Sequence, residues 1–68
     1  MDVKVKIVAG ETEERIIEAA EDDTYECVLA KLGVNPVEVV VLRNGKPVPE
    51  DETVDKSDIT VIRIVSGG

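Results

Sequence analysis

The stretch VEVVVLRNGKPV, residues 37–48, decides the fold of this chain. Apolar residues alternate at positions 37, 39 and 41, a period of two that predicts a strand over residues 37–43 with one apolar face. Asn44-Gly45 follows at once, and this dipeptide is a strong signal for a tight hairpin turn. Lys46–Val48 should therefore return as a short strand, which Pro47 and Pro49 limit to the edge of a sheet.

Two more strands are expected before this hairpin and one after it. Apolar residues alternate over residues 3–8 and again over residues 14–19, and the glycine-containing segment 9–12 should join these strands into an antiparallel hairpin. Ile16 falls on the opposite face from Ile17. Residues 59–65 form the most hydrophobic strand of the chain, so we place this strand at the centre of the sheet, parallel to the first.

A short helix is predicted over Tyr25–Leu32. Its apolar residues recur at helical spacing, acidic residues precede it, and Gly33 should end it. Either Asp23, with Glu26 three residues later, or Thr24 can serve as the N-cap. Tyr25 should lie at the core or its edge, with its hydroxyl reaching water. The contact between helix and sheet should involve Val28, Leu29, Leu32, Ile59 and Val61.

Together these elements predict an α+β fold, in which a mixed sheet of four to five strands packs on one helix. The chain has 68 residues, which is room for a single small domain. We expect that domain over residues 1–65, followed by a flexible C-terminal tail, Ser-Gly-Gly, at residues 66–68. The domain is expected to be a monomer.

The composition argues against several classes of protein. Eight basic residues against fifteen acidic ones give a net charge of −7, which disfavours direct contact with nucleic acid or an anionic membrane surface. The sequence shows neither a membrane-spanning run nor a signal peptide, so we expect a cytoplasmic protein. Cys27 is the single cysteine and histidine is absent, so we expect no internal disulfide, no metal site and no histidine-based catalysis. The acidic clusters lack the ligand spacing of a calcium loop.

Gly67 and Gly68 are the first candidates for function. Glycine has no Cβ, so two glycines after a rigid strand make a thin connection that can enter a narrow channel and present a carboxylate inside another protein. A frayed end of the chain, with no role, is the alternative reading of the same two residues.

The whole chain resembles the β-grasp ubiquitin-like proteins. The resemblance rests on the two hairpins around one helix, on the turn Asn44-Gly45-Lys46-Pro47-Val48-Pro49-Glu50-Asp51, and on the closing Ile62-Arg63-Ile64-Val65-Ser66-Gly67-Gly68. Within that superfamily the chain is most similar to the small archaeal ubiquitin-like modifier proteins. The thiamine sulfur carrier and the small subunit of molybdopterin synthase are its next relatives by this resemblance.

The resemblance implies that the chain is a protein-borne substrate and not an enzyme. Gly68 would be adenylated by a partner that resembles ubiquitin-activating enzymes, with ATP and magnesium bound by that partner and no cofactor bound by this chain. The acyl adenylate would then become a thiocarboxylate, for sulfur transfer to tRNA or a cofactor precursor, or would be conjugated to lysines of target proteins. Sulfur-transfer enzymes and target proteins are therefore the further partners implied.

The outer face of the predicted sheet is the second candidate site. Strand alternation turns seven residues away from the helix and gives an apolar strip with a basic edge. Ubiquitin-like proteins dock partners on the corresponding face, which favours docking over a surface of scattered apolar residues. A plain protein-binding module, in which this face matters and the tail does not, is the competing function. The seven residues are Lys4, Lys6, Val8, Val40, Leu42, Ile62 and Ile64.

Overall fold

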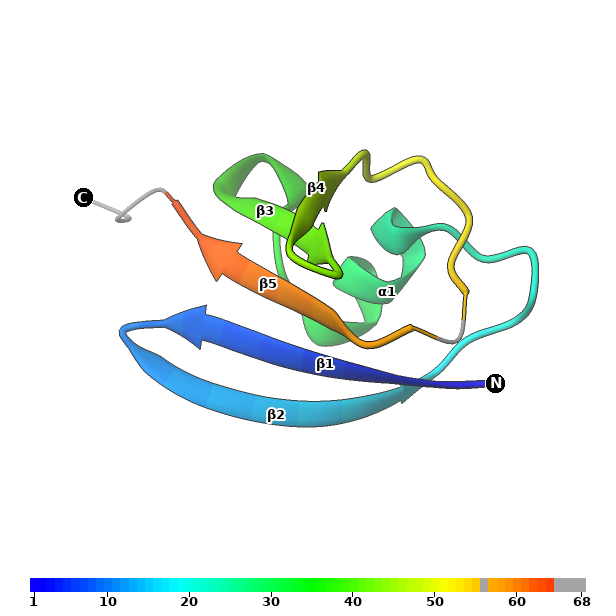
Figure 1. The fold of residues 1–68 in the computed structure, drawn as a ribbon, viewed down its shortest axis with the longest axis horizontal. Helices are drawn as coiled ribbons and strands as arrows, with labels where there is room; N and C mark the ends of the chain where they lie inside the picture. The colour runs from blue at the N-terminus through cyan, green and yellow to red at the C-terminus, as the bar shows by residue number, and fades with distance from the viewer. Residues whose placement is uncertain (56, 65–68) are drawn as a thin grey trace.

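Among the described residues, five strands form one mixed sheet with one α-helix against one of its faces (Figure 1). The computed structural model describes residues 1–55 and 57–64. Along the sheet the order is β2-β1-β5-β3-β4. The bounds are β1 Asp2–Ala9, β2 Glu11–Glu18, α1 Tyr25–Leu32, the 3₁₀ helix η1 Pro36–Glu38, β3 Val39–Arg43, β4 Lys46–Val48 and β5 Ile59–Arg63. This arrangement confirms the expected α+β fold.

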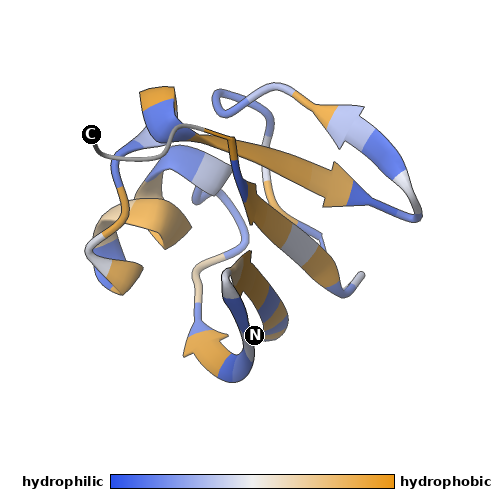
Figure 2. Cartoon of the chain, turned by 90° about the vertical axis from the view of Figure 1, so that its left-hand side faces the viewer, coloured by the Kyte–Doolittle hydropathy of each residue, from blue (hydrophilic) through white to orange (hydrophobic). Residues whose placement is uncertain are grey.

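The last strand, β5, lies at the centre of the sheet, as its apolar sequence predicts. It runs parallel to β1, where Val5 is opposite Ile59, and antiparallel to β3, where Val41 is opposite Val61. The short strand β4 lies at an edge, also as predicted. In Figure 2 the helix is on one side of the sheet, and β3 and β5 are hydrophobic along most of their length.

The core lies between α1 and the inner face of the sheet. Val28 and Leu29 are buried there, as expected, whereas Leu32 is only partly buried at the end of the helix. Tyr25 is fully buried, so the expectation that its hydroxyl reaches water is wrong. The hydroxyl oxygen instead accepts a hydrogen bond of 3.2 Å from the guanidinium of Arg43. The buried cluster comprises Val3, Val5, Ala19, Tyr25, Val28, Leu29, Val41, Val54, Ile59 and Val61.

Thr24 is the N-cap of α1, which settles the two alternatives from the sequence. Its hydroxyl oxygen accepts a hydrogen bond from the Cys27 amide at 3.4 Å. The carboxylate of Asp23 instead accepts a hydrogen bond of 2.9 Å from the amide of Ala20, in the turn before the helix. Gly33 ends the helix with a φ of 73°, a left-handed conformation that favours glycine.

Three element boundaries differ from the sequence predictions by two residues or more. β2 begins at Glu11 and not at residue 14, because Gly10, with a φ of 86°, reverses the chain within a single residue. β3 begins at Val39, because Asn35 caps a 3₁₀ turn that includes Val37 and leaves that side chain 74% exposed. β5 ends at Arg63, and position 65 lies outside the described residues.

The segment at residues 49–55 is tied by hydrogen bonds to the start of the helix. The amides of Tyr25 and Glu26 donate to the carbonyls of Glu52 and Glu50, at 3.1 and 2.8 Å. These amides are among those that a helix leaves without partners inside its first turn. Arg43 adds ion pairs of 3.3 Å to Glu52 and to Asp55. The segment therefore completes the helix N-terminus instead of lying loosely over it.

We predict that Leu29→Ala lowers the free energy of unfolding by about 2–5 kcal/mol, because it leaves a cavity beneath the helix. That loss is large for a domain of this size. Urea unfolding followed by circular dichroism measures it. The matched control is Ile16→Ala, which removes a side chain that is 69% exposed and should change stability by less than about 0.5 kcal/mol. Equal effects of the two substitutions would contradict the packing described here.

We also predict an acid-sensitive contribution to stability from Asp23. The hydrogen bond from the Ala20 amide, and then that from Lys31, lower the pKa of Asp23 below its usual 3.8. A carboxyl whose pKa is lower in the folded state stabilises the fold above that usual value, and the contribution is lost as the pH falls through the folded pKa. In the Asp23→Asn variant, the free energy of unfolding should therefore decrease less steeply as the pH is lowered below about 4. Lys31→Met should reduce this slope only in part, and an unchanged slope in both variants would refute the assignment.

Candidate functional site

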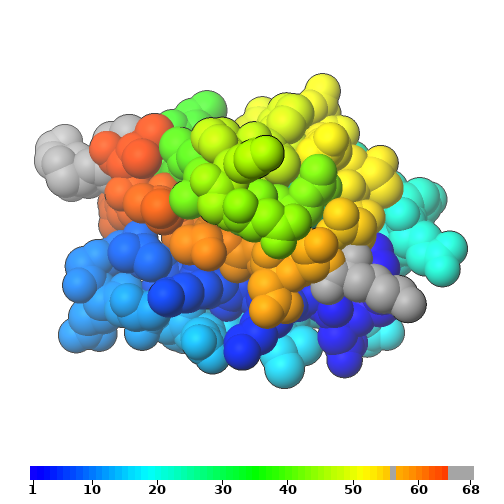
Figure 3. Space-filling model, in the orientation of Figure 1, coloured from blue at the N-terminus to red at the C-terminus, as the bar shows by residue number. Residues whose placement is uncertain are grey.

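The outer face of the sheet carries the predicted apolar strip in register. Val8 is opposite Ile62, and Ile62 is opposite Val40, so these three side chains form one row across β1, β5 and β3. Leu42 belongs to the next row, opposite Thr60. All four apolar residues are partly exposed and lie outside the buried cluster and its packing neighbours. Figure 3 shows atoms of β1 in blue, β5 in orange and the β3–β4 hairpin in green next to one another on this face.

The remaining predicted docking residues lie at the margins of this row. Ile64 follows β5 and is 61% exposed, and its amide donates to the carbonyl of Glu38 at 2.9 Å. Lys4 and Lys6 are exposed on β1. The ammonium of Lys4 lies 3.6 Å from the carboxylate of Glu14 on β2. This carboxylate therefore neutralises part of the positive charge that the sequence predicted at this margin.

Gly67 and Gly68, the predicted activation site, lie outside the described residues. The strand that leads to them is described up to Ile64. This strand, β5, is held by a ladder on each side, from β1 and from β3. The chain segment that carries the two glycines therefore continues from the centre of the sheet and not from one of its edges.

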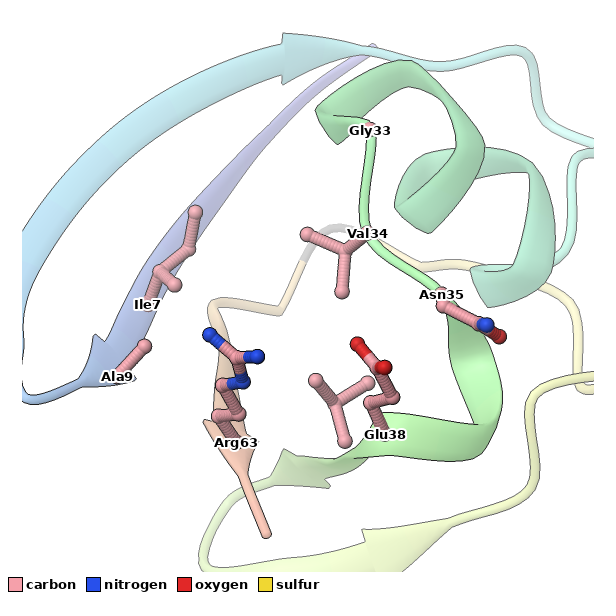
Figure 4. A pocket seen from close by; sticks show the side chains of 8 residues that line it. Ile7, Ala9, Gly33, Val34, Asn35, Glu38 and Arg63 are labelled. Atoms are coloured by element: carbon pink, nitrogen blue, oxygen red, sulfur yellow. The ribbon is translucent and has the colours of Figure 1, made fainter. Parts of the chain in front are cut away.

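A pocket of about 190 Å³ lies on the helix side of the sheet at the same end of β5. Ile7, Val34 and Val39 give it apolar walls, and Figure 4 shows the side chains of Glu38 and Arg63 pointing into it. No local sequence pattern predicted this pocket. Its walls come from the end of β1, the segment after α1, η1, the start of β3 and the end of β5, which only the tertiary structure brings together.

Cys27 and the acidic side chains are the groups that could take part in catalysis or metal binding. Cys27 is exposed on α1, and its sulfur accepts a hydrogen bond of 3.5 Å from the hydroxyl of Thr24. Within residues 1–55 and 57–64, no three His, Cys, Asp or Glu side chains gather in a way that could hold a metal ion. Over the same residues, no helix has the length and apolar character needed to span a membrane.

Comparison with known proteins gives one family. Residues 1–65 match the family of small archaeal modifier protein 2. The chain is 38% identical to small archaeal modifier protein 2 of Haloferax volcanii over 68 residues, which cover all of both chains. It is 35% identical to an uncharacterized protein of Archaeoglobus fulgidus, again over the full length of both.

Solved structures show the same fold at lower sequence identity. A ubiquitin of Caldiarchaeum subterraneum superposes with a TM-score of 0.68 and 22% identity, over the full length of both chains. A ubiquitin-like protein of the same organism gives a TM-score of 0.63 and 19% identity, with 98% of this chain and 100% of that one covered. These likenesses confirm the β-grasp fold.

The resemblance inferred from the turn at residues 44–51 and from the closing residues 62–68 is thus confirmed. Ubiquitin-like modifiers are protein tags rather than catalysts, and they depend in general on an activating enzyme and on target proteins. The chain belongs to the small archaeal modifier protein 2 family.

Proposed function

We propose that the carboxylate of Gly68 is the working group of this modifier. In the first step it attacks the α-phosphate of ATP, pyrophosphate leaves, and an acyl adenylate forms. A sulfur nucleophile then expels AMP to give a thiocarboxylate, or a partner cysteine expels AMP to give a thioester that a target lysine attacks. Membership in the modifier family carries the proposal, and the Gly67-Gly68 sequence after the central strand supports it.

The two glycines suit this role because they lack a Cβ. A segment without side chains can enter a channel too narrow for other residues, so that the carboxylate reaches a buried nucleotide. Binding of the rigid domain outside the channel then fixes the direction from which the segment enters. In this proposal ATP and magnesium bind to the activating partner, and the reaction takes place in the cytoplasm.

The outer face of the sheet is proposed as the surface that docks the activating enzyme. The row formed by Val8, Ile62 and Val40, with Leu42 beside it, offers a continuous apolar contact on the most regular part of the sheet. Lys4 and Lys6 stand at its margin, where a partner's acidic side chains can pair with them. An apolar centre with a charged margin is typical of protein interfaces.

A second function, non-covalent binding through this face alone, is favoured by the same row. The row is present whether or not Gly68 is ever activated, so it supports a plain binding module equally well. Removal of Gly68 separates the two proposals, because a binding module keeps its affinity without that residue and a modifier loses its chemistry.

We predict that Leu42→Asp and Ile62→Asp each weaken binding to the activating enzyme by about tenfold or more, because each buries an unpaired charge in the contact. Calorimetry with the purified enzyme measures the affinity, and an amide NMR spectrum tests the fold. Val37→Asp is the matched control, since this exposed valine lies in η1 and not on the outer face. Unchanged affinity in both outer-face variants would show that the face is ordinary surface.

The fate of the tail gives the next prediction. Arg63 is the last basic residue, so trypsin acting on a conjugate should leave Ile64-Val65-Ser66-Gly67-Gly68 attached to the target lysine. A sulfur carrier should instead show one carboxylate oxygen replaced by sulfur in the intact mass. We expect the thiocarboxylate in protein from its own cells and, in addition, the branched peptides.

Both species should disappear when Gly68 is removed or the activating enzyme is deleted. Those two strains are the controls for the mass spectrometry. If neither species is found in cells where the protein is abundant and its activating enzyme is present, the proposed chemistry is wrong and the binding module takes its place.

A further inference from the structure

The strand β2, Glu11–Glu18, is a long exposed edge of the sheet. The opposite edge, β4, has only three residues and contains Pro47, which makes it a poor template for another strand. β2 has eight residues and no proline. Of the two edges, β2 is therefore the one that can accept an added strand.

The hydrogen bonds at the end of the β1–β2 ladder show which main-chain groups of β2 face outward. The Met1 amino group donates to the Ala19 carbonyl at 2.7 Å, and the Ala19 amide donates to the Met1 carbonyl at 2.8 Å, so these two residues form a hydrogen-bonded pair. Such pairs alternate along an antiparallel ladder. With the observed register, Val3 opposite Ile17 and Val5 opposite Arg15, the odd residues of β2 bond to β1. The even residues point their N–H and C=O groups away from the sheet.

At the Glu18 end of this edge, main-chain groups already have hydrogen-bond partners. The ammonium of Lys31 donates to the carbonyl of Glu18 at 2.7 Å, and Asp23 bonds both the amide and the carbonyl of Ala20. For Thr12, Glu14 and Ile16, the outward main-chain groups have no hydrogen-bond partner among residues 1–55 and 57–64. The open part of the edge therefore runs over residues 12–16, with three amides and three carbonyls available.

The side chains along β2 define what can bind there. Four glutamates and one arginine give this eight-residue strand a net charge of −3, within a chain of net charge −7. The side chain of Ile16 is 69% exposed on the outer face, whereas that of its neighbour Ile17 packs against the core. A fitting partner is thus an extended segment with basic side chains and an apolar residue that can lie beside Ile16.

A second copy of this chain fits the same edge less well than a basic segment does. Pairing of two β2 strands would bring together two segments that each carry a net charge of −3, and like charges destabilise cross-strand pairs. The acidic side chains therefore act against self-association, a common protection of exposed edges, while they favour a basic partner.

We propose that the open edge of β2, residues 12–16, binds an extended basic peptide segment as a sixth strand of the sheet. Main-chain hydrogen bonds to Thr12, Glu14 and Ile16 hold the segment, and the glutamates select its charge. This binding is non-covalent and independent of Gly68. It goes beyond the proposed function, because it uses neither the tail nor the apolar row of the outer face.

The test uses the full chain and a capped hexapeptide that alternates lysine and valine. Amide hydrogen exchange is measured by NMR with and without the peptide. The proposal expects new protection at the amides of Thr12, Glu14 and Ile16, and little change at Glu13 and Arg15, which already donate to β1. A peptide of the same sequence, methylated on two consecutive amides, has the same charge and should bind at least about fivefold more weakly.

A pair of variants at one position isolates the main chain of β2. Glu14→Pro removes an outward amide without breaking the ladder to β1, whereas Glu14→Ala removes the same side chain and keeps that amide. We expect peptide affinity to be at least about fivefold lower for the proline variant than for the alanine variant. Should the proline variant fail to fold, the exchange pattern of the unmodified chain decides the question alone.

Three results would overturn the proposal. Equal binding of the methylated peptide would show charge attraction only. Protection at sites other than the even residues of β2 would place the peptide elsewhere. Dimerisation of the chain through β2 in the absence of peptide, seen by sedimentation together with exchange protection at the same amides, would show that the edge is occupied by a second copy.

Discussion

The central position of β5 is the constraint on which the rest of the structure depends. Because β5 pairs with β1 on one side and β3 on the other, its inward residues Ile59 and Val61 must face the helix, and Ile62 must face outward. A shift of one residue would reverse this and expose the core. The same pairing aligns the apolar row of the outer face. The core and this outer row thus share one register.

The small core is supplemented by hydrogen bonds from the segment that precedes β5. The buried cluster contains one aromatic residue, Tyr25, so the apolar area available in this short chain is modest. The loop carbonyls of Glu50 and Glu52 accept from the first amides of α1, and the Val54 amide donates back to the Asp23 carbonyl at 2.8 Å. These bonds satisfy groups that a helix end exposes. They join the helix and the loop into one unit, so that loosening the loop also loosens the helix.

Sequence patterns predicted the elements in which local and tertiary preferences agree. Asn44 and Gly45 both adopt positive φ, 54° and 78°, as the tight turn between β3 and β4 requires, so that hairpin could be foreseen. Apolar alternation failed where other forces decided the conformation. Val37 continues the alternation of β3 but belongs to a 3₁₀ turn started by Asn35. β2 begins at Glu11, and its first three residues, 11–13, are all polar and show no apolar alternation. The pocket beside Arg63 had no local signal, because five separate parts of the chain form it.

The two proposed surfaces, the acidic edge of β2 and the apolar outer face, lie far enough apart to be occupied by two partners at the same time. A strand added to β2 extends the sheet sideways by one strand spacing, about 4.8 Å, and does not cover the faces of the strands already present. The row of Val8, Ile62 and Val40 begins one strand away from that edge, with Lys4 and Glu14 paired between the two surfaces. A partner on the face would contact side chains alone, whereas a partner at the edge would bond to main-chain groups of β2 and contact Ile16 and the glutamates beside them. In these two proposals one small sheet offers two recognition surfaces that differ in chemistry, and neither requires the central strand to move.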